Sequence, residues 1–568
     1  MSSRLRLILL LSSFVVVWFA EIDHRALTRP DEGRYSEIAR EMSVSGDFVT
    51  PRLNDLKYFE KPPLQYWATA IAYKVFGEHN WTARLWSALT GLFGVGCVYW
   101  IARRMYGLET AIAATAISGS ALWYFAIAHI NTLDMGLTAW MTLTLVSFLH
   151  AQRDDATPRG RSIAMHVAWA AMGLAMLSKG LIGIVLPGGV LMFYSLWQRD
   201  WKLWDRLHMA TGLLLFLAIV VPWFAWVQAR NPEFSEFFFF HEHLDRFSST
   251  THRREGAWWY FVPILVGGFA PWTLLLAWVL PSVLRNLRAK EAPSARAAMA
   301  SNAAVAPAAE KPFHGERLLA VWVGFIFLFF SASGSKLPSY IVPVFPALAL
   351  LLAPRMAQCP PRAYAVNVAI GVVFAIACIV ALANAGRFAS DEVASELLQA
   401  MWPWLIASLT ALLIGLVVAW RRRLQGRSIN AIVATALGCL VAWQLAIRGY
   451  NELSPASSSY HLVRSIEARH GPLDRTLPMY SIRTYEQTLP FYLKRTMTLV
   501  DFYDEMALGL FQEPHKGIES LPKFLPIWSA LPAGYAAMRP ETYDELKQLQ
   551  VPMRLLGSDT RRVIVSRK

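Results

Sequence analysis

The chain has 568 residues, of which 55% are hydrophobic and only 17% are charged, whereas soluble domains are about a quarter charged. Its formal net charge is +14, but much of this charge lies in short loops between apolar runs, and no RNA-binding signature or basic tail is present, which argues against a nucleic-acid partner. Four cysteines without a CxxC pair support neither a disulfide framework nor a zinc knuckle.

Apolar runs long enough to cross a membrane recur along the chain. A helix crosses the hydrocarbon layer, about 30 Å thick, with roughly 20 residues. Hydropathy and length predict about thirteen spans, at 5–21, 81–102, 109–128, 133–151, 163–180, 181–198, 207–229, 257–283, 317–333, 339–354, 363–386, 402–420 and 429–448. The first run lacks a convincing cleavage site and precedes charged residues, so we interpret it as an uncleaved span. Residues 1–448 are therefore predicted to form an all-α polytopic membrane domain.

The loops predict the orientation of these spans, because short cytoplasmic loops carry an excess of Lys and Arg. One side collects the basic loops, including residues 286–312, which are rich in Ala, Pro and Ser and are predicted to be flexible and cytoplasmic. The other side holds residues 22–80, 129–132, 230–256, 334–338, 387–401 and everything after 448. We expect this outer side to face the periplasm or another non-cytoplasmic compartment.

The first outer loop, residues 22–80, is predicted to contain two helices. In DEGRYSEIAREM, Tyr35, Ile38, Ala39 and Met42 share one helical face, which suits a short helix at the membrane interface. The segment PPLQYWATAIAYKVFG (62–77) is aromatic-rich and too short to span comfortably, so we expect a second interfacial helix there.

Residues 449–568 are more polar and lack a predicted span. The segments LPMYSIRTY and TMTLVDF have the composition of strands, and a helix is expected between them, from Glu486 to Leu493. We interpret this part as a small soluble α/β domain on the outer side.

Two acidic residues on different outer loops are candidates for catalysis. Asp31 lies in the first outer loop, and Asp134 lies in HINTLDMG at the outer start of the fourth span. Asp31 by itself could simply begin a helix, since Asp is a favoured residue there. Because both carboxylates project from the same side of the membrane, they can converge on one site.

Several cations also lie on the outer side, against the general trend of the loops. They come from separate segments: Lys61 in YFEKPP, Lys179 in AMLSKG, Arg246 in EHLDRF and Lys336 in SGSKLPSY. An isolated outer Lys is usually a solvated anchor, but several at the ends of spans suggest an anion held at headgroup depth. Phosphate fits best, because Lys and Arg neutralise it and Arg can grip it with two hydrogen bonds.

A divalent metal is a further candidate ligand, held by His241, His243 and Glu60. The HEH sequence has no strong metal spacing, and a polar loop that accepts hydrogen bonds is the alternative interpretation. No other cofactor is predicted, because Walker A, GxSxG, HExxH and GxGxxG motifs in their required settings are absent.

DEGRYSEIAREM, GDFVTPRLN and YFEKPPLQYW, with LSKG, EHLDRF and GSKLPSYIVPVFPALA further on, resemble the lipid A aminoarabinose transferases. These belong to the integral-membrane GT-C glycosyltransferases, which include the protein O-mannosyltransferases. The resemblance covers nearly the whole chain, although the C-terminal domain carries little motif signal. It implies a GT-C fold in a multi-pass protein of the bacterial inner membrane, with its active site facing the periplasm.

The resemblance also implies the reaction: inverting transfer of 4-amino-4-deoxy-L-arabinose from undecaprenyl phosphate to lipid A phosphate groups, which gives resistance to polymyxin and other cationic peptides. The implied catalytic residues are Asp31 and Asp134. The implied carrier-phosphate contacts are Lys61 and Arg246, with Tyr58, Lys179, Lys336 and Tyr340 nearby. Transfer of another sugar to a lipid or protein acceptor is an alternative. A lipid or sugar transporter is disfavoured, because charged residues gather at one face and not at the membrane midplane.

Overall fold

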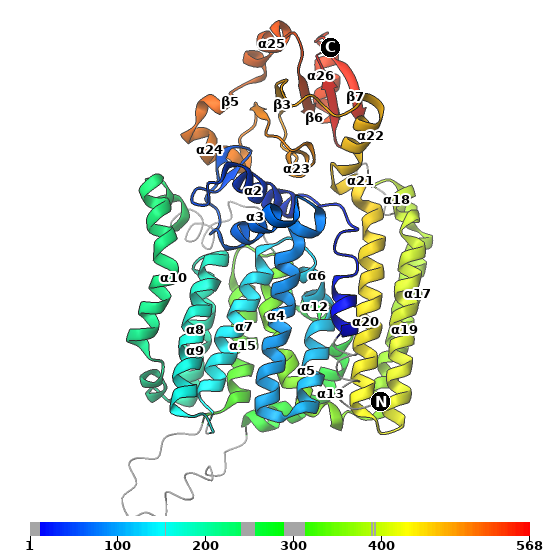
Figure 1. Cartoon of the computed structure of the whole chain (residues 1–568). Coiled ribbons are helices and arrows are strands. Elements are labelled where there is room, and N and C mark those ends of the chain that lie inside the picture. Colours follow the sequence, from blue (N-terminus) through cyan, green and yellow to red (C-terminus); the bar gives the residue numbers. More distant parts are fainter. Residues whose placement is uncertain are drawn as a thin grey trace, which may run out of the picture.

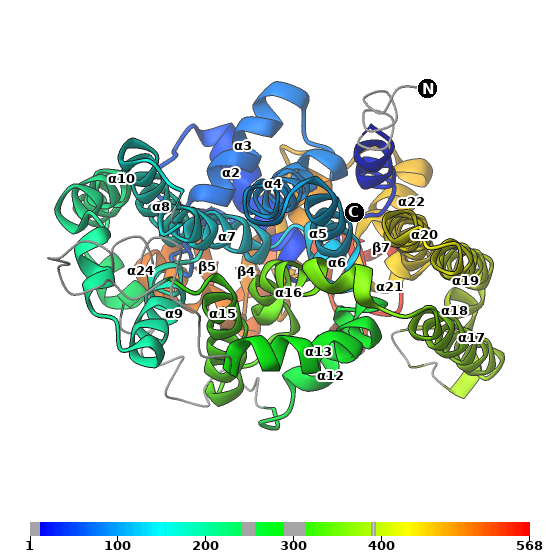
Figure 2. The same ribbon diagram turned by 90° about the horizontal axis from the view of Figure 1, so that it is seen from below.

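The structure, a computed structural model, describes residues 12–153, 155–239, 256–288, 313–387, 390 and 393–567. Figure 1 shows three levels: a bundle of long helices, a layer formed by the first outer loop, and a smaller domain with a sheet above them. Figure 2 shows the bundle end-on, with α8 and α10 at one end, α17, α19 and α20 at the other, and α4, α5, α7 and α16 between them.

The bundle consists of helices that follow the predicted spans closely. They are α4 (Asn80–Tyr106), α5 (Leu108–Ser120), α6 (Leu122–Ala128), α7 (Leu133–Ala151), α8 (Pro158–Lys179), α9 (Ile182–Gln198), α10 (Met209–Arg230), α12 (Phe261–Gly268), α13 (Trp272–Arg288), α15 (Gly315–Ala332), α16 (Phe345–Leu352), α17 (Pro361–Ala383), α19 (Trp402–Leu424) and α20 (Ser428–Tyr450). Shorter pieces are η1 (Lys202–Arg206), η3 (Pro338–Val344), η4 (Ala353–Gln358), η5 (Ala385–Arg387) and α18 (Ser395–Ala400). The chain is thus a polytopic membrane protein.

The expected number of thirteen spans is not confirmed. Within the described residues, seven helices are long and apolar enough to cross a membrane, or up to nine if each of two bent pairs is one span. The pair α5 and α6 bends by 65°, and α12 and α13 bend by 102°. Pro271 lies at the second bend, where its ring and missing N–H prevent an α-helix from continuing. The expected flexible loop lies almost entirely in residues 289–312, outside the described part.

The first outer loop forms α2 (Asp31–Ser45), a hairpin of β1 (Arg52–Leu53) and β2 (Leu56–Lys57), and α3 (Leu64–Phe76). Helix α2 ends at Gly46, whose φ of 74° is the left-handed conformation that glycine adopts at a helix end. Helix α3 leaves Ile71, Val75 and Phe76 exposed, the apolar surface that an interfacial helix presents to lipid.

Helix α2 differs from a simple interfacial helix, because its polar side is buried as well. Tyr35, Ile38 and Ala39 belong to an apolar core, but Glu32 and Glu37 are also at most 1% exposed. Arg25 and Arg84 enclose Glu32, and the C-terminal domain covers the outer side of α2 (Figure 1). Gly33 shows how close this contact is, since a Cβ there would lie 2.6 Å from the backbone carbon of Gln487.

The C-terminal domain has a six-stranded sheet in the order β5-β4-β3-β6-β8-β7. The strands are β3 (Met479–Ile482), β4 (Thr498–Val500), β5 (Gly517–Ile518), β6 (Tyr535–Met538), β7 (Arg554–Ser558) and β8 (Val563–Ser566). Strands β5, β4, β3 and β6 are parallel to one another. Strand β8 pairs antiparallel with β6 on one side and with β7 on the other. The helices are η6 (Asn451–Leu453), α21 (Ser454–Ser457), α22 (Tyr460–His470), α23 (Leu489–Leu493), η7 (Asp504–Met506), α24 (Ala507–Gln512), η8 (Pro514–Lys516), α25 (Leu521–Ala530) and α26 (Pro540–Gln548).

The C-terminal domain is tied to the first outer loop by several hydrogen bonds. The Leu27 amide donates to the Tyr492 hydroxyl at 2.7 Å. The Asn54 side chain donates to the Met497 carbonyl at 2.7 Å and accepts from the Met497 amide at 2.8 Å. Buried polar groups that are satisfied by a partner in this way fix one domain against the other.

Candidate active site

Asp31 and Asp134 each occupy the first turn of a helix, α2 and α7 respectively. The partial positive charge of a helix N-terminus favours a carboxylate at this position. The segment that precedes α7 contacts the first half of α2. The Asn131 amide donates to Glu32 at 3.1 Å, and its side-chain amide donates to Ser36 at 3.0 Å. Both acids therefore lie at the same outer end of the bundle, joined by a short polar connection.

Asp134 is paired with Lys179, whose ammonium donates to its carboxylate. Lys179 ends α8, and its nitrogen also lies 4.7 Å from the centre of the Tyr340 ring. The pair is largely shielded from solvent, with the side chain of Asp134 only 11% exposed. The structure thus brings together three predicted site residues. It places Lys179 in the role of a counter-ion to Asp134, and the predicted phosphate contact of Lys179 stays a prediction.

Lys336 is buried, and its ammonium is directed to the backbone of its own segment. Its ammonium donates to the carbonyls of Ser331 at 3.1 Å and Ser333 at 2.5 Å. Its side chain is also in contact range of Gly256, since a Cβ there would lie 3.0 Å from the Lys336 Cδ. Its predicted contact with the carrier phosphate remains a prediction.

Asp31 lies in a second charged group, centred on Arg34. One guanidinium nitrogen of Arg34 donates to Asp31 at 3.0 Å, and another lies 2.6 Å from a carboxylate oxygen of Glu505 in the C-terminal domain. Glu60 and Tyr58 are close enough to Arg34 to act on it electrostatically. This group unites three predicted site residues, Asp31, Tyr58 and Glu60, with two residues that were not predicted, Arg34 and Glu505.

The remaining predicted residues are only partly located. The Lys61 ammonium donates to the Glu60 carbonyl at 2.7 Å. Arg246, His241 and His243 lie outside the described residues. Within the described residues no group of three potential metal ligands occurs, and the metal hypothesis, which needs both histidines, stays a prediction.

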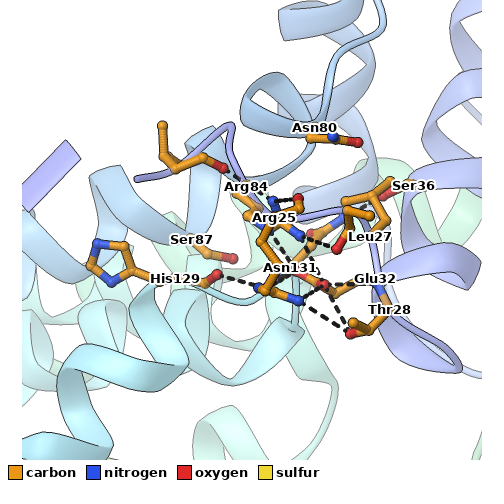
Figure 3. Close-up of polar contacts among 12 residues, drawn as sticks. Arg25, Leu27, Thr28, Glu32, Ser36, Asn80, Arg84, Ser87, His129 and Asn131 are labelled. Atoms are coloured by element: carbon orange, nitrogen blue, oxygen red, sulfur yellow. Dashed lines mark hydrogen bonds and ion pairs between the residues drawn. The ribbon is translucent and has the colours of Figure 1, made fainter. Parts of the chain in front are cut away.

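Glu32, directly after Asp31, forms a buried ionic network that the sequence did not reveal (Figure 3). Its carboxylate accepts two hydrogen bonds from Arg25, at 2.7 and 2.9 Å, and two from Arg84, at 2.8 and 3.0 Å. Burial alone would raise the pKa of Glu32, but the charges of Arg25 and Arg84 outweigh it and lower that pKa far below its usual value. The network joins α2, α4 and the segment before α7, and so fixes Asp31 relative to Asp134.

The sequence marked some members of these two charged groups, the one around Arg34 and the one around Glu32. Glu32 and Arg34 lie inside DEGRY, the motif that marked Asp31, so a reading of the whole motif would have included them. Arg25, Arg84 and Glu505 have no such mark, because nothing in a single sequence indicates that these distant residues meet α2.

The arrangement has the parts needed to handle a charged, lipid-linked substrate. It offers two carboxylates, each held by a cation, at the outer end of a membrane bundle. Carboxylates in such a position can stabilise positive charge on a sugar carbon or bind a cationic group.

Comparisons with known proteins agree with this architecture. A family described as dolichyl-phosphate-mannose-protein mannosyltransferase matches residues 3–238, and one described as aminoarabinose transferase C-terminal domain matches residues 462–567. An undecaprenyl phosphate-alpha-4-amino-4-deoxy-L-arabinose arabinosyl transferase of Erwinia tasmaniensis is 28% identical over 90% of this chain and 89% of that protein. The protein of the same name in Pseudomonas aeruginosa is 32% identical over 63% of this chain and 61% of that protein.

A solved structure is similar over the full length of the chain. The crystal structure of ArnT from Cupriavidus metallidurans bound to undecaprenyl phosphate is 36% identical, covers 100% of this chain and 99% of that one, and has a TM-score of 0.89. Fold and similarity together define an integral-membrane glycosyltransferase that uses a lipid-linked sugar. Within that class, the chain belongs to the aminoarabinose transferase family, as the motifs of the first outer loop had predicted.

Proposed function

We propose that this enzyme transfers 4-amino-4-deoxy-L-arabinose from undecaprenyl phosphate to the phosphate groups of lipid A, at the periplasmic face of a Gram-negative inner membrane. The observation that carries the proposal is the full-length similarity to a solved transferase bound to undecaprenyl phosphate, together with the paired acids at the outer end of the bundle. Addition of the amino sugar neutralises lipid A and gives resistance to polymyxin and other cationic peptides.

The leaving group of the donor is a lipid phosphate, which departs as an anion. Fixed cations beside it stabilise the transition state, and this is the role we assign to Lys61 and Arg246. The sugar carbon meanwhile gains oxocarbenium character, as in glycoside hydrolysis, and a nearby carboxylate stabilises it. A single direct displacement by the acceptor oxygen inverts the anomeric centre.

Asp31 is assigned to positioning the donor and supporting its positive charge, and not to base catalysis. A phosphate monoester is already largely ionised near neutral pH, because its second pKa is about 6. A general base would remove a proton that is mostly absent, so its contribution would be small. The exposure of the Asp31 side chain, 38% despite its contact with Arg34, leaves it accessible to a substrate.

The proposal is tested by mass spectrometry of lipid A from bacteria that lack the gene, express it, or express the Asp31→Asn variant. We expect lipid A to gain the mass of one or two aminoarabinose residues only with the unaltered protein. A gain with a different mass would favour another sugar. Normal modification by Asp31→Asn would remove Asp31 from the mechanism.

A further inference from the structure

A cavity lies at the inner end of the bundle, away from the C-terminal domain, where α4 and α7 end and α15 begins. Its volume is about 340 Å³, within the range of pockets that hold small ligands, roughly 300–1,000 Å³. Helix α7 separates it from Asp134, because the 19 residues of this helix extend over about 28 Å. The cavity is therefore distinct from the candidate active site. Apolar, polar and charged residues line it: Met105, Leu149, Phe313, Gln152, Arg153 and Asp155.

Gln152 lines this cavity with a side-chain amide that has no partner. The residue is only 2% exposed, and neither its amide nitrogen nor its amide oxygen makes a hydrogen bond with any of the described residues. The nitrogen can donate two hydrogen bonds, and the oxygen can accept two. A buried amide that is left unpaired costs free energy. A ligand that offers both an acceptor and a donor would remove this cost.

Arg153 adds a cation whose hydrogen-bonding capacity is only partly used. Its Nε and Nη2 donate to the Asp155 carboxylate at 2.8 and 2.5 Å, whereas its buried Nη1 makes no hydrogen bond within the described part of the chain. Asp155 thus holds the guanidinium in place and leaves one nitrogen for a ligand. Positive charge is in excess here, because Arg104 and Arg161 also lie close to the end of α7. The charge balance therefore favours an anion.

The apolar wall of the cavity indicates that the anion is carried by a lipid. Met105, Leu149 and Phe313 form this wall at the end of a membrane bundle, where the headgroups of a bilayer lie. Basic pockets between membrane helices are known to bind the phosphates of lipid headgroups. A phosphate supplies acceptors for the Gln152 nitrogen and for Arg153 Nη1. A hydroxyl on the same headgroup supplies the donor that the Gln152 oxygen lacks.

We propose that this cavity binds the headgroup of an anionic phospholipid whose phosphate carries a hydroxylated group, as in phosphatidylglycerol. The phosphate accepts hydrogen bonds from the side chains of Gln152 and Arg153, and a headgroup hydroxyl donates to the Gln152 oxygen. The first methylene groups of the acyl chains lie against the apolar wall. A headgroup that ends in an ammonium is disfavoured, because the three arginines outweigh Asp155.

The test titrates two lipids with the same acyl chains, dioleoyl phosphatidylglycerol and dioleoyl phosphatidylethanolamine, into the full-length protein in detergent and measures binding by native mass spectrometry. We expect one phosphatidylglycerol to bind at least about tenfold more tightly than phosphatidylethanolamine. Gln152→Leu and Arg153→Gln should each weaken phosphatidylglycerol binding about tenfold, as expected for a lost hydrogen bond to a charged group. Equal affinity for the two lipids, or unchanged phosphatidylglycerol binding in both variants, would overturn the proposal.

Thermal unfolding without added lipid separates loss of the site from loss of the fold. Gln152→Leu should unfold at the same temperature as the unaltered protein or higher, because leucine removes an unpaired buried amide. Phosphatidylglycerol should raise the melting temperature of the unaltered protein and hardly change that of Gln152→Leu. A clearly lower melting temperature for Gln152→Leu in the absence of lipid would show that the amide has a partner within the protein, and the site would lose its basis.

Gln425→Leu and Arg421→Gln are the matched controls. Both residues are exposed near the end of α19, and neither lines the cavity, so both variants should bind phosphatidylglycerol as the unaltered protein does. The soluble compound sn-glycerol 3-phosphate carries the same phosphate and hydroxyl groups without acyl chains. If it raised the melting temperature as much as phosphatidylglycerol does at the same concentration, the ligand would be a free phosphate ester, and the assignment to a lipid would be wrong.

Discussion

Lys179 and Asp134 form a shielded ion pair at the candidate active site. The two residues come from the ends of neighbouring helices and make an ion pair with little exposure to solvent. Removing one partner of such a pair is costly, because the other charge stays buried without compensation. The pair is therefore expected to act as a unit in catalysis.

A double-mutant cycle measures this coupling. We expect Lys179→Met and Asp134→Asn each to lower the transfer rate strongly, and the double variant to be hardly worse than either one. The coupling free energy should lie at about 1–3 kcal/mol. Additive effects of the two substitutions on kcat/KM would show that Lys179 acts independently, for example on the carrier phosphate.

Glu41 makes the stability of the protein depend on pH. It accepts hydrogen bonds from the amides of Asn54 and Asp55, at 2.5 and 2.7 Å. Burial, and secondly the neighbouring Glu37, raises the pKa of Glu41 from 4.5 to about 8. Between these two values the folded protein binds a proton that the unfolded chain has lost. The contribution of Glu41 to stability therefore falls as pH rises through this window.

Thermal unfolding in detergent between pH 5 and pH 8 tests this expectation. The melting temperature of the unaltered protein should fall more steeply with pH than that of Glu41→Gln, which cannot ionise. Glu519→Gln, at an exposed residue of the C-terminal domain, serves as the control and should follow the unaltered protein. Equal slopes in all three would contradict the assignment.

Helix α2 is the element on which the site depends, because it contacts the bundle on one side and the C-terminal domain on the other. Glu32 binds it to α4 and to the segment before α7, while Arg34 and Gly33 meet the C-terminal domain. The sequence allowed the helix and its apolar face to be predicted, since both follow from local spacing. Its covered polar face could not be predicted, because the partners Arg84 and Glu505 lie far along the chain and no local pattern marks them.

Gly33→Ala tests the contact between α2 and the C-terminal domain. The new Cβ would lie 2.6–2.7 Å from backbone atoms of Gln487 and Thr488, which cannot move as easily as a side chain. We expect the domain to shift from α2, with faster hydrogen exchange in residues 486–493 and reduced transfer. Gly96→Ala is the control, since a Cβ there meets nothing within 4 Å and alanine favours a helix. Unchanged hydrogen exchange in Gly33→Ala would show that the contact between α2 and the C-terminal domain can accommodate a Cβ at position 33.

At the scale of the whole molecule, the sequence predicted the class of fold well. Long apolar runs can satisfy their backbone polar groups only as helices in a membrane, so the bundle follows from composition and length. The exact number of spans does not follow, because the bends between α5 and α6 and between α12 and α13 break the simple relation of one run to one straight helix.

Orientation in the membrane is tested by labelling single cysteines in intact cells. Tyr503→Cys lies on the C-terminal domain and Leu424→Cys at the end of α19, and both positions are exposed. Three of the four native cysteines are buried and the fourth is half-buried, so their background labelling should be low. We expect an impermeant maleimide to label position 503 in intact cells and position 424 only after lysis. The reverse result would invert the proposed topology.

The covering of α2 by the C-terminal domain also means that the site is complete only after nearly the whole chain has been made. Gln487 and Glu505 are synthesised hundreds of residues after Gly33 and Arg34, so α2 stays uncovered until the end of the chain has folded against it. A chain that stops before Gln487 lacks the contact of Glu505 with Arg34 and that of Gln487 with Gly33. Truncated products of this gene should therefore be inactive.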